Sequence, residues 1–212
     1  MPKRTFNRLD DDKKERVIRA AIEEFQARGF ENAKIEAIAR NAEVAKGSIY
    51  QYFDDKKELF IYSVTWTLEY FMKIIDRQTP LQDMDVYDYF LSGSRERFEL
   101  LKQEPLLVAF SMDIYTGKFG SLALEATREL SRIGEEYELK LIANGRRKGT
   151  VREDLDDKTL LLFFQGVTEK FDTEIMEKVK SFDYNPTEEH YREMENLLKN
   201  MISLLKQGMG RN

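Results

Sequence analysis

The sequence predicts an all-helical protein in which a small helix-turn-helix unit precedes a larger helical part. Glycine and proline are scarce, at eleven and four among 212 residues, which leaves few turns for a many-stranded sheet. Apolar residues recur at helical spacing through most of the chain. Hydrophobic residues make up 42% of the sequence, so a packed core is expected and wholesale disorder is not.

Three helical segments fill the first part of the chain. The first is expected over 10–28, ends at Gly29, and has its apolar positions at Val17, Ile18, Ala21, Ile22 and Phe25. A second runs from Ile35 to Ala42, and after a turn around Glu43 a third spans about 45–52. Helices as short as the last two are marginal alone in water and must pack on the first. Three such helices with a tight turn between the second and third predict a helix-turn-helix unit.

Longer helices follow. They are expected over 55–78, 83–102, 106–115, 122–147, 156–180 and 187–206, with proline or glycine at most of the breaks. We therefore expect a DNA-binding domain at 1–54 and a helical effector-binding and dimerisation domain at 55–212, joined by the helix that starts at Asp55.

The composition leaves little room for catalytic or metal chemistry. Cysteine is absent and His190 is the single histidine, so disulfides, thiolate-bound metal and a Ser-His-Asp relay are not available. His190 is interpreted as a solvated helix residue. Because no glycine-rich phosphate loop and no nucleophile beside a plausible base is found, we expect no enzyme, no cofactor and no metal.

Apolar runs and charge bear on location and partners. The longest purely apolar run is Leu160–Phe164, far short of the roughly 20 residues of a membrane span. We expect a soluble cytoplasmic protein with no membrane partner. Of the net charge of −5, residues 1–60 hold 13 Lys and Arg against 12 Asp and Glu, and the remainder holds 21 against 27. The position of the cations, more than the net charge, decides whether nucleic acid can bind.

The third helix carries side chains suited to a major groove. If Ile49 and Phe53 point inward, the outward positions are Lys46, Gly47, Ser48, Tyr50 and Gln51. Lysine bonds guanine or phosphate, serine and glutamine form adaptable hydrogen bonds, and glycine lets the backbone approach closely. Tyrosine hydroxyls reach phosphate oxygens. On the residues alone, nucleic-acid binding and an ordinary surface helix both stay open.

The stretch from Ala20 to Phe60 resembles the DNA-binding region of the TetR family of bacterial repressors. The residues that carry the resemblance are Gly29, Phe30, Ile38, Ala39, Ala42, Val44, Lys46, Gly47, Ser48, Ile49, Tyr50, Tyr52, Phe53, Lys56, Leu59 and Phe60. A second segment, 149–156, is similar to the loop that often precedes the dimerisation helices of that family.

The resemblance implies which residues meet DNA. Those expected to face it are Lys46, Gly47, Ser48, Tyr50, Gln51 and Tyr52, while Lys56 is expected to contact phosphate from a helix N-terminus. Three positions depart from the family pattern, with Ala33 in place of threonine, Glu43 in place of glycine, and Ala45 in place of serine. Each lost hydroxyl cap costs roughly 0.5–2 kcal/mol of helix stability. Lys34 is expected to restore one phosphate contact.

The last two helices are apolar on more than one face, which predicts packing against two partners. One partner is the chain's own core, and the resemblance favours a second copy as the other, in a four-helix homodimer interface. The interface is expected to include Leu161, Leu162, Gly166, Leu197, Met201 and Leu205. A fully internal pair of helices stays open as the alternative. A dimer would read two half-sites of a two-fold symmetric DNA operator.

Aromatic and methionine side chains gather between these parts. Each is more often ordinary core, but as a group they fit the effector pocket that the resemblance implies, for a small apolar molecule. The expected lining is Trp66, Tyr70, Phe98, Phe110, Met112, Tyr115 and Phe163.

The function predicted from these features is a dimeric transcriptional repressor whose operator affinity changes when a small molecule binds. The alternative is an effector-independent architectural or cell-division factor that binds DNA with the same fold. A helical enzyme or a protein-interaction module is the third interpretation.

Overall fold

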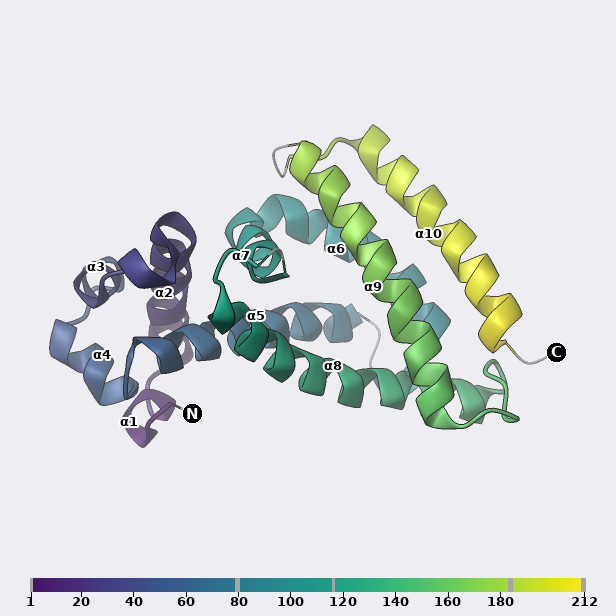
Figure 1. Cartoon of the computed structure of the whole chain (residues 1–212), viewed down its shortest axis with the longest axis horizontal. Coiled ribbons are helices and arrows are strands. Elements are labelled where there is room, and N and C mark those ends of the chain that lie inside the picture. The colour runs from purple at the N-terminus through teal and green to yellow at the C-terminus, as the bar shows by residue number, and fades with distance from the viewer. Residues whose placement is uncertain (1, 79–80, 116, 183–184, 211–212) are drawn as a thin grey trace. The chain divides into compact units, whose positions relative to one another are not determined.

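The computed structural model describes residues 2–78, 81–115, 117–182 and 185–210 and confirms the all-helical class (Figure 1). Its helices are α1 (Arg4–Asn7), α2 (Asp11–Asn32), α3 (Ile35–Asn41), α4 (Lys46–Tyr52), α5 (Lys56–Gln78), the 3-10 helix η1 (Leu81–Asp83), α6 (Val86–Gln103), α7 (Pro105–Tyr115), α8 (Ser121–Lys148), α9 (Asp157–Ser181) and α10 (Glu188–Met209). Within the described ranges, no helix is long and apolar enough to cross a membrane.

The chain packs as two compact units. Unit 1 consists of Met1–Phe71 and Leu106–Leu130, and unit 2 of Met72–Pro105 and Ser131–Asn212. The helices α5 and α8 each contribute residues to both units. The expected functional boundary after residue 54 falls inside unit 1, because Leu59 and Phe60 of α5 are fully buried in the same core as α2, α3 and α4. That boundary stays a prediction.

An aromatic cluster forms the centre of unit 1. The ring of Phe60 lies 5.1 Å from that of Phe25, 5.8 Å from Phe110 and 4.9 Å from Phe119. Pairs of this kind contribute about 0.5–1.5 kcal/mol each beyond the burial of their area. The helix α7 is therefore built into the same core as the helix-turn-helix, although it follows that motif by more than forty residues.

The expected stop at Gly29 is a break within a longer helix. Gly29 has φ 70° and ψ 166°, outside helical values, and helical bonding resumes for one turn as far as Asn32. A positive φ is readily adopted by glycine and rarely by other residues.

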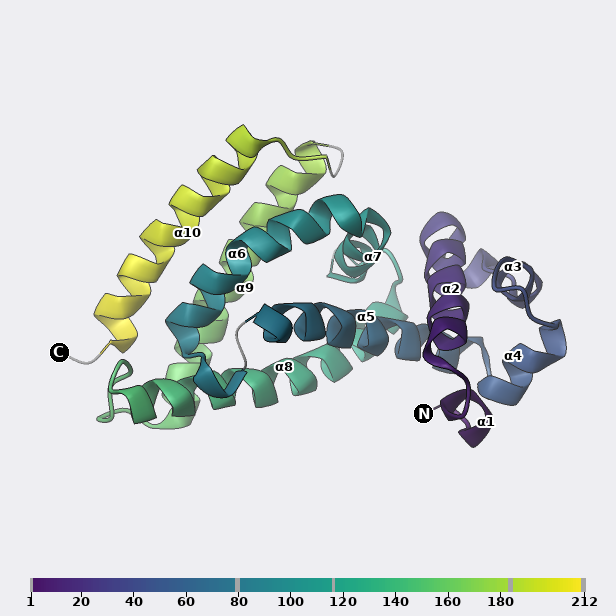
Figure 2. The ribbon, with the colours of Figure 1, turned by 180° about the vertical axis from the view of Figure 1, so that it is seen from behind.

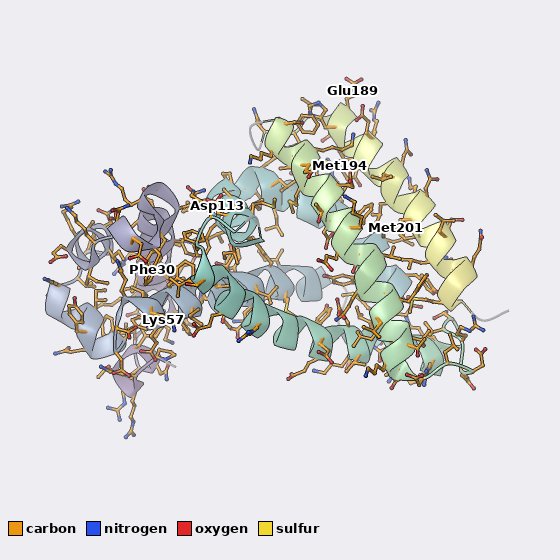
Figure 3. All side chains as sticks on the ribbon, viewed as in Figure 1. Phe30, Lys57, Asp113, Glu189, Met194 and Met201 are labelled. Carbon is orange, nitrogen blue, oxygen red and sulfur yellow. The ribbon has the colours of Figure 1, made fainter. Side chains whose placement is uncertain are left out.

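Unit 2 is built from α6, most of α8, α9 and α10. Its core includes Phe90, Leu141, Phe164, Leu198 and Leu205. The buried Asn144 donates to the carbonyls of Leu81 and Met84 at 2.7 and 2.8 Å, which fastens η1 to α8. Figure 3 labels Met194 and Met201, two buried residues of α10.

His190 is half-buried and has a structural role, unlike the solvated helix residue that was expected. It forms a capping box at the start of α10, in which its Nδ1 accepts a hydrogen bond from the Thr187 backbone at 3.1 Å. Its ring stacks on Phe182 with centroids 3.5 Å apart.

Candidate nucleic-acid interface

The turn between α3 and α4 has the geometry of a helix-turn-helix. Ile35 and Ile38 of α3 and Ile49 of α4 are buried, and the Val44 N–H donates to the Ala39 carbonyl at 2.9 Å. Glu43 supplies the reversal with φ 57°. In this left-handed region a residue with a Cβ costs roughly 1–2 kcal/mol. Glu43 therefore adopts an unfavourable backbone conformation at the position where the family pattern has glycine.

The helix α4 separates an inward and an outward face as its spacing predicts. Ile49 and Phe53 are 2% and 1% exposed, whereas Tyr50 is 47% exposed. Lys46, Gly47 and Gln51 are also exposed, and Ser48 is half-buried. These polar side chains and the bare backbone at the glycine are available to an external partner.

Gly47 is not required by the protein's own packing. A Cβ placed there would meet no atom within 4 Å in the described part of the chain. Its backbone angle also lies outside the positive range, so an alanine would fit without strain. The absence of a side chain therefore leaves space for something outside the chain.

Tyr52 does not face outward, and the expectation that it meets DNA is wrong. It is 6% exposed, and its ring lies 5.7 Å from that of Phe6. The reason is helical periodicity, because Tyr52 follows Ile49 by three residues and lies on the same inward face.

Lys56 has partners within the protein that the sequence did not reveal, and its expected phosphate contact stays a prediction. Its Nζ donates to the carbonyls of Glu31 and Ala33, both at 3.1 Å, and lies 4.7 Å from the centre of the Phe30 ring. Two of its three donors therefore close the end of α2. Phe30 is labelled in Figure 3.

Lys46 forms an ion pair with Glu36 of α3. The hydrogen bond from Lys46 lowers the pKa of the Glu36 carboxyl, and the same bond raises the pKa of the Lys46 ammonium. Both groups are thus charged at neutral pH, and the cation that begins the recognition helix is matched by an acid of the neighbouring helix.

Two helices of the motif begin without a side-chain cap. Lys34 precedes α3 and Ala45 precedes α4, and neither side chain caps its helix. Lys34 is exposed, and its backbone N–H donates to Glu24 Oε1 at 3.0 Å. The expected phosphate contact of Lys34 stays a prediction.

The sequence interpretation missed the segment 2–9, called here the α1 segment. Its Lys3 donates from the backbone to the Tyr52 carbonyl at 2.8 Å and from Nζ to the Tyr50 carbonyl at 3.0 Å. Its Phe6 is fully buried. Phe6 and Leu9 are too few apolar positions to give a helical period, which is why the four-residue helix was not predicted.

The residues expected to line an effector pocket are divided between the two units. Trp66, Tyr70, Phe110 and Met112 belong to unit 1, and Phe98 and Phe163 to unit 2. Phe110 is core, fully buried beside Phe60. The side chain of Tyr115 lies outside the described residues.

Phe163 faces α10, which does not agree with its place in the expected pocket lining. It is 44% exposed, and a Cβ built on Gly208 would lie 2.8 Å from its ring. The ring therefore packs against the bare backbone of α10 and leaves one edge at the surface.

The expected dimer residues fall into two groups. Leu162, Gly166 and Leu197 are exposed. Leu161, Met201 and Leu205 are instead buried within unit 2, so their assignment to a surface is wrong. Periodicity alone does not separate the two apolar faces of one helix.

Comparison with known proteins places these features in a family. Residues 17–62 match the model of the bacterial regulatory proteins of the tetR family. The regulator HbdR of Aromatoleum is 34% identical over 74 residues, which cover 35% of this chain and 32% of that protein. The biofilm-operon negative regulator IcaR of Staphylococcus aureus is 25% identical over 138 residues, covering 60% of this chain and 73% of IcaR.

Solved structures match over the whole chain. A TetR family regulator from Chloroflexus aurantiacus is 25% identical with a TM-score of 0.59, and each chain is covered completely. The regulator FadR from Bacillus subtilis, solved in complex with stearoyl-CoA, is 18% identical with a TM-score of 0.64, covering 92% of this chain and 98% of FadR. The described motif, the matching family model and these likenesses agree that the chain is a helix-turn-helix DNA-binding transcriptional regulator of the TetR family, a family without enzymatic activity.

Proposed function

We propose that this regulator represses transcription as a homodimer on a two-fold symmetric operator and that a small apolar molecule changes its operator affinity. The observation that carries the proposal is α4, which uses its apolar face in the core and presents a polar face with an unfilled glycine. The proposed DNA contacts are Lys34, Lys46, Gly47, Ser48, Tyr50 and Gln51.

Exposed apolar residues on the last two helices support the dimer. Of the six large hydrophobic side chains that are exposed in the described part of the chain, four lie on α9 or α10, namely Leu162, Phe163, Leu197 and Leu204. Leu162 and Leu204 are 61% and 67% exposed. A concentration of apolar surface on two adjacent helices is typical of a protein interface. A two-fold pairing of this face would bury it in a four-helix contact.

The chemistry of the effector is proposed from two sources. The aromatic and methionine residues of α5, α6 and α7 give both units an apolar interior that suits a hydrophobic molecule. FadR, which has this fold, binds stearoyl-CoA. An acyl chain or another bulky apolar compound is therefore the effector class to test first. Any such molecule changes repression only through a difference in its affinity for the DNA-bound and free conformations.

The test begins with DNA from upstream of the protein's own coding region. Binding is measured at fixed salt against a scrambled duplex of the same length, because phosphate contacts alone make affinity strongly salt-dependent. We expect preferential binding to a site with two-fold symmetry and loss of that preference in Lys46→Ala. The variant should sediment with the same mass as the unmodified protein, since Lys46 lies outside the proposed dimer face.

Equal affinity for both duplexes would contradict the operator proposal. If operator binding holds but acyl and aromatic compounds leave it unchanged, the effector-independent architectural or cell-division role takes precedence. The two results are therefore distinguishable in one assay.

A further inference from the structure

The α1 segment is a short stretch of unit 1 that contains three cations and no acid of its own. Residues 2–9 contain Lys3, Arg4 and Arg8 and no Asp or Glu. The adjoining start of α2 is acidic, with Asp10 as its cap and Asp11 and Asp12 in its first turn. The positive charge is thus confined to one short stretch of chain.

Hydrogen bonds attach this segment to the end of the recognition helix. Lys3 Nζ donates to the carbonyls of Tyr50 at 3.0 Å and Phe53 at 3.4 Å, and it pairs with Asp54 at 2.8 Å. The Thr5 hydroxyl donates to the Gln51 carbonyl. The carbonyls of Tyr50 and Gln51 are among the last of α4, which have no partner within the helix, and Phe53 follows directly after it. The segment therefore closes α4 in the way that a C-terminal cap does.

Buried aromatic contacts hold the segment in place as well. The ring of Phe6 is fully buried, 4.9 Å from Phe53 and 5.4 Å from Tyr62. Both views of the ribbon place α1 beside the last turn of α4 (Figures 1 and 2). The segment is thus docked on the helix whose outer face carries Tyr50 and Gln51.

The two arginines take no part in this attachment. Arg4 and Arg8 are exposed, and neither guanidinium forms a hydrogen bond, ion pair or ring contact within the described residues. The ammonium of Lys3 is engaged by these contacts, whereas the two guanidinium groups remain available to an external partner. Guanidinium groups bind phosphate oxygens in a bidentate manner and are always charged.

We propose that the α1 segment is a second DNA-contacting element, in which Arg4 and Arg8 bind backbone phosphates next to the base pairs read by α4. This inference rests on the proposed operator binding and extends it. Because the segment is anchored on the carbonyls of Tyr50 and Gln51, its arginines are carried with those side chains when α4 enters a groove. Phosphate contacts of this kind position the helix and carry no base specificity.

The experiment compares Arg4→Ala/Arg8→Ala with a matched control, Lys73→Ala/Lys140→Ala. The control removes the same charge from exposed positions of α5 and α8. Affinity is measured over a series of salt concentrations for the upstream duplex and for the scrambled duplex. Each lost phosphate contact lowers the slope of log affinity against log salt by about 0.9. The dimer of the arginine variant loses two contacts per protomer, so its slope should fall by about 3.6.

The arginine variant should bind both duplexes about tenfold more weakly near physiological salt, with the ratio between them preserved. Hydroxyl-radical footprints should lose protection at phosphates flanking each half-site. The thermal unfolding midpoint should stay unchanged because Lys3, Thr5 and Phe6 are kept. If alanine lowers that midpoint, Arg4→Gln/Arg8→Gln repeats the test with side chains of greater length.

An unchanged slope, or an equal loss in the control, would overturn the inference. In either case Lys46→Ala still reports on α4, so a failure of the α1 segment is distinguishable from a failure of operator binding. If the unmodified protein shows no preference for the upstream duplex, the proposed function fails instead, and any remaining loss in the arginine variant reflects generic electrostatic binding.

Discussion

The outer face of α4 and the outer faces of α9 and α10 expose opposite kinds of side chain. The first presents polar groups and bare backbone around Gly47, while the second presents leucines and a phenylalanine. Each of these exposed faces belongs to helices whose opposite face is buried in a hydrophobic core. The contrast indicates two different partners, a hydrated polyanion for α4 and an apolar protein surface for α9 and α10.

Their relation to the sequence differs too. The α4 face is encoded in one short stretch of consecutive residues, so turn, cap and groove-facing positions can be assigned together. The α9 and α10 face is encoded in two helices whose apolar residues recur on more than one face. The sequence indicates that such helices pack against two partners, but it does not show which apolar residue faces which partner.

Breaking the apolar face should have the largest effect. Leu162→Glu/Leu204→Glu places charges on the two most exposed leucines of α9 and α10. We expect a shift from dimer to monomer in sedimentation, and with it a fall of at least about 100-fold in operator affinity, because linked half-site binding is lost. Binding to one isolated half-site should be unchanged.

The matched control for that change is Leu91→Glu, which charges a leucine of α6 that is 45% exposed. It should leave the mass and the operator affinity as they are. A dimer that persists in Leu162→Glu/Leu204→Glu would mean that the exposed leucines of α9 and α10 are not the interface.

The polar face is tested next by filling Gly47. Alanine at this position has room within the protein and a higher helix propensity, so stability should be unchanged or slightly raised. In a groove the added methyl group would separate the backbone from DNA, and we expect about a tenfold loss of operator affinity, roughly one base-pair mismatch in size. Undiminished binding in Gly47→Ala would place the closest DNA approach elsewhere.

The features that could be predicted from the sequence are those that depend on residues close together in the chain. The order and type of the long helices followed from apolar period and from glycine and proline breaks. Tyr52 was misassigned because a shared family pattern does not state side-chain direction, although the three-residue step from Ile49 does. The internal role of Lys56 was missed because its partners, the carbonyls of Glu31 and Ala33, lie more than twenty residues away and are backbone atoms that leave no trace in the sequence.

The same limit applies to tertiary packing. That α7 joins the core of the helix-turn-helix unit through Phe60 and Phe110 depends on how the chain returns, which no local period reports. Likewise, Met201 and Leu205 lie on the same helix as the exposed Leu204, and only the packed structure separates them.

A smaller effect is expected at the turn that holds α4. Glu43→Gly removes a Cβ from a residue with φ 57° and should raise the free energy of unfolding by about 1 kcal/mol. The control is Glu43→Ala, which removes the same charge but keeps the Cβ, and should give no such gain. Urea denaturation of the three proteins separates strain from charge. Equal stability of the glycine and alanine variants would show that the turn is not strained.

The smallest expected effect concerns the ion pair between Glu36 and Lys46. The carboxylate balances the lysine, and near DNA it also repels phosphate. Glu36→Gln would leave the ammonium of Lys46 unpaired in each protomer and make the salt dependence of dimer binding steeper by up to about 1.8 in slope. We expect affinity for scrambled DNA to rise a few-fold and affinity for the operator to rise less, so that the ratio between them falls.

Glu135→Gln, which neutralises an exposed acid of α8, is the matched control and should change neither quantity. The comparison separates a local role of Glu36 from the general gain in net positive charge. If both variants raise affinity equally, the pair has no special part in recognition. If only Glu36→Gln does so, this acid limits non-specific binding and the lysine engages DNA only where base contacts compensate for the broken pair. That outcome would make α3 a contributor to specificity through a charge that never needs to touch the operator.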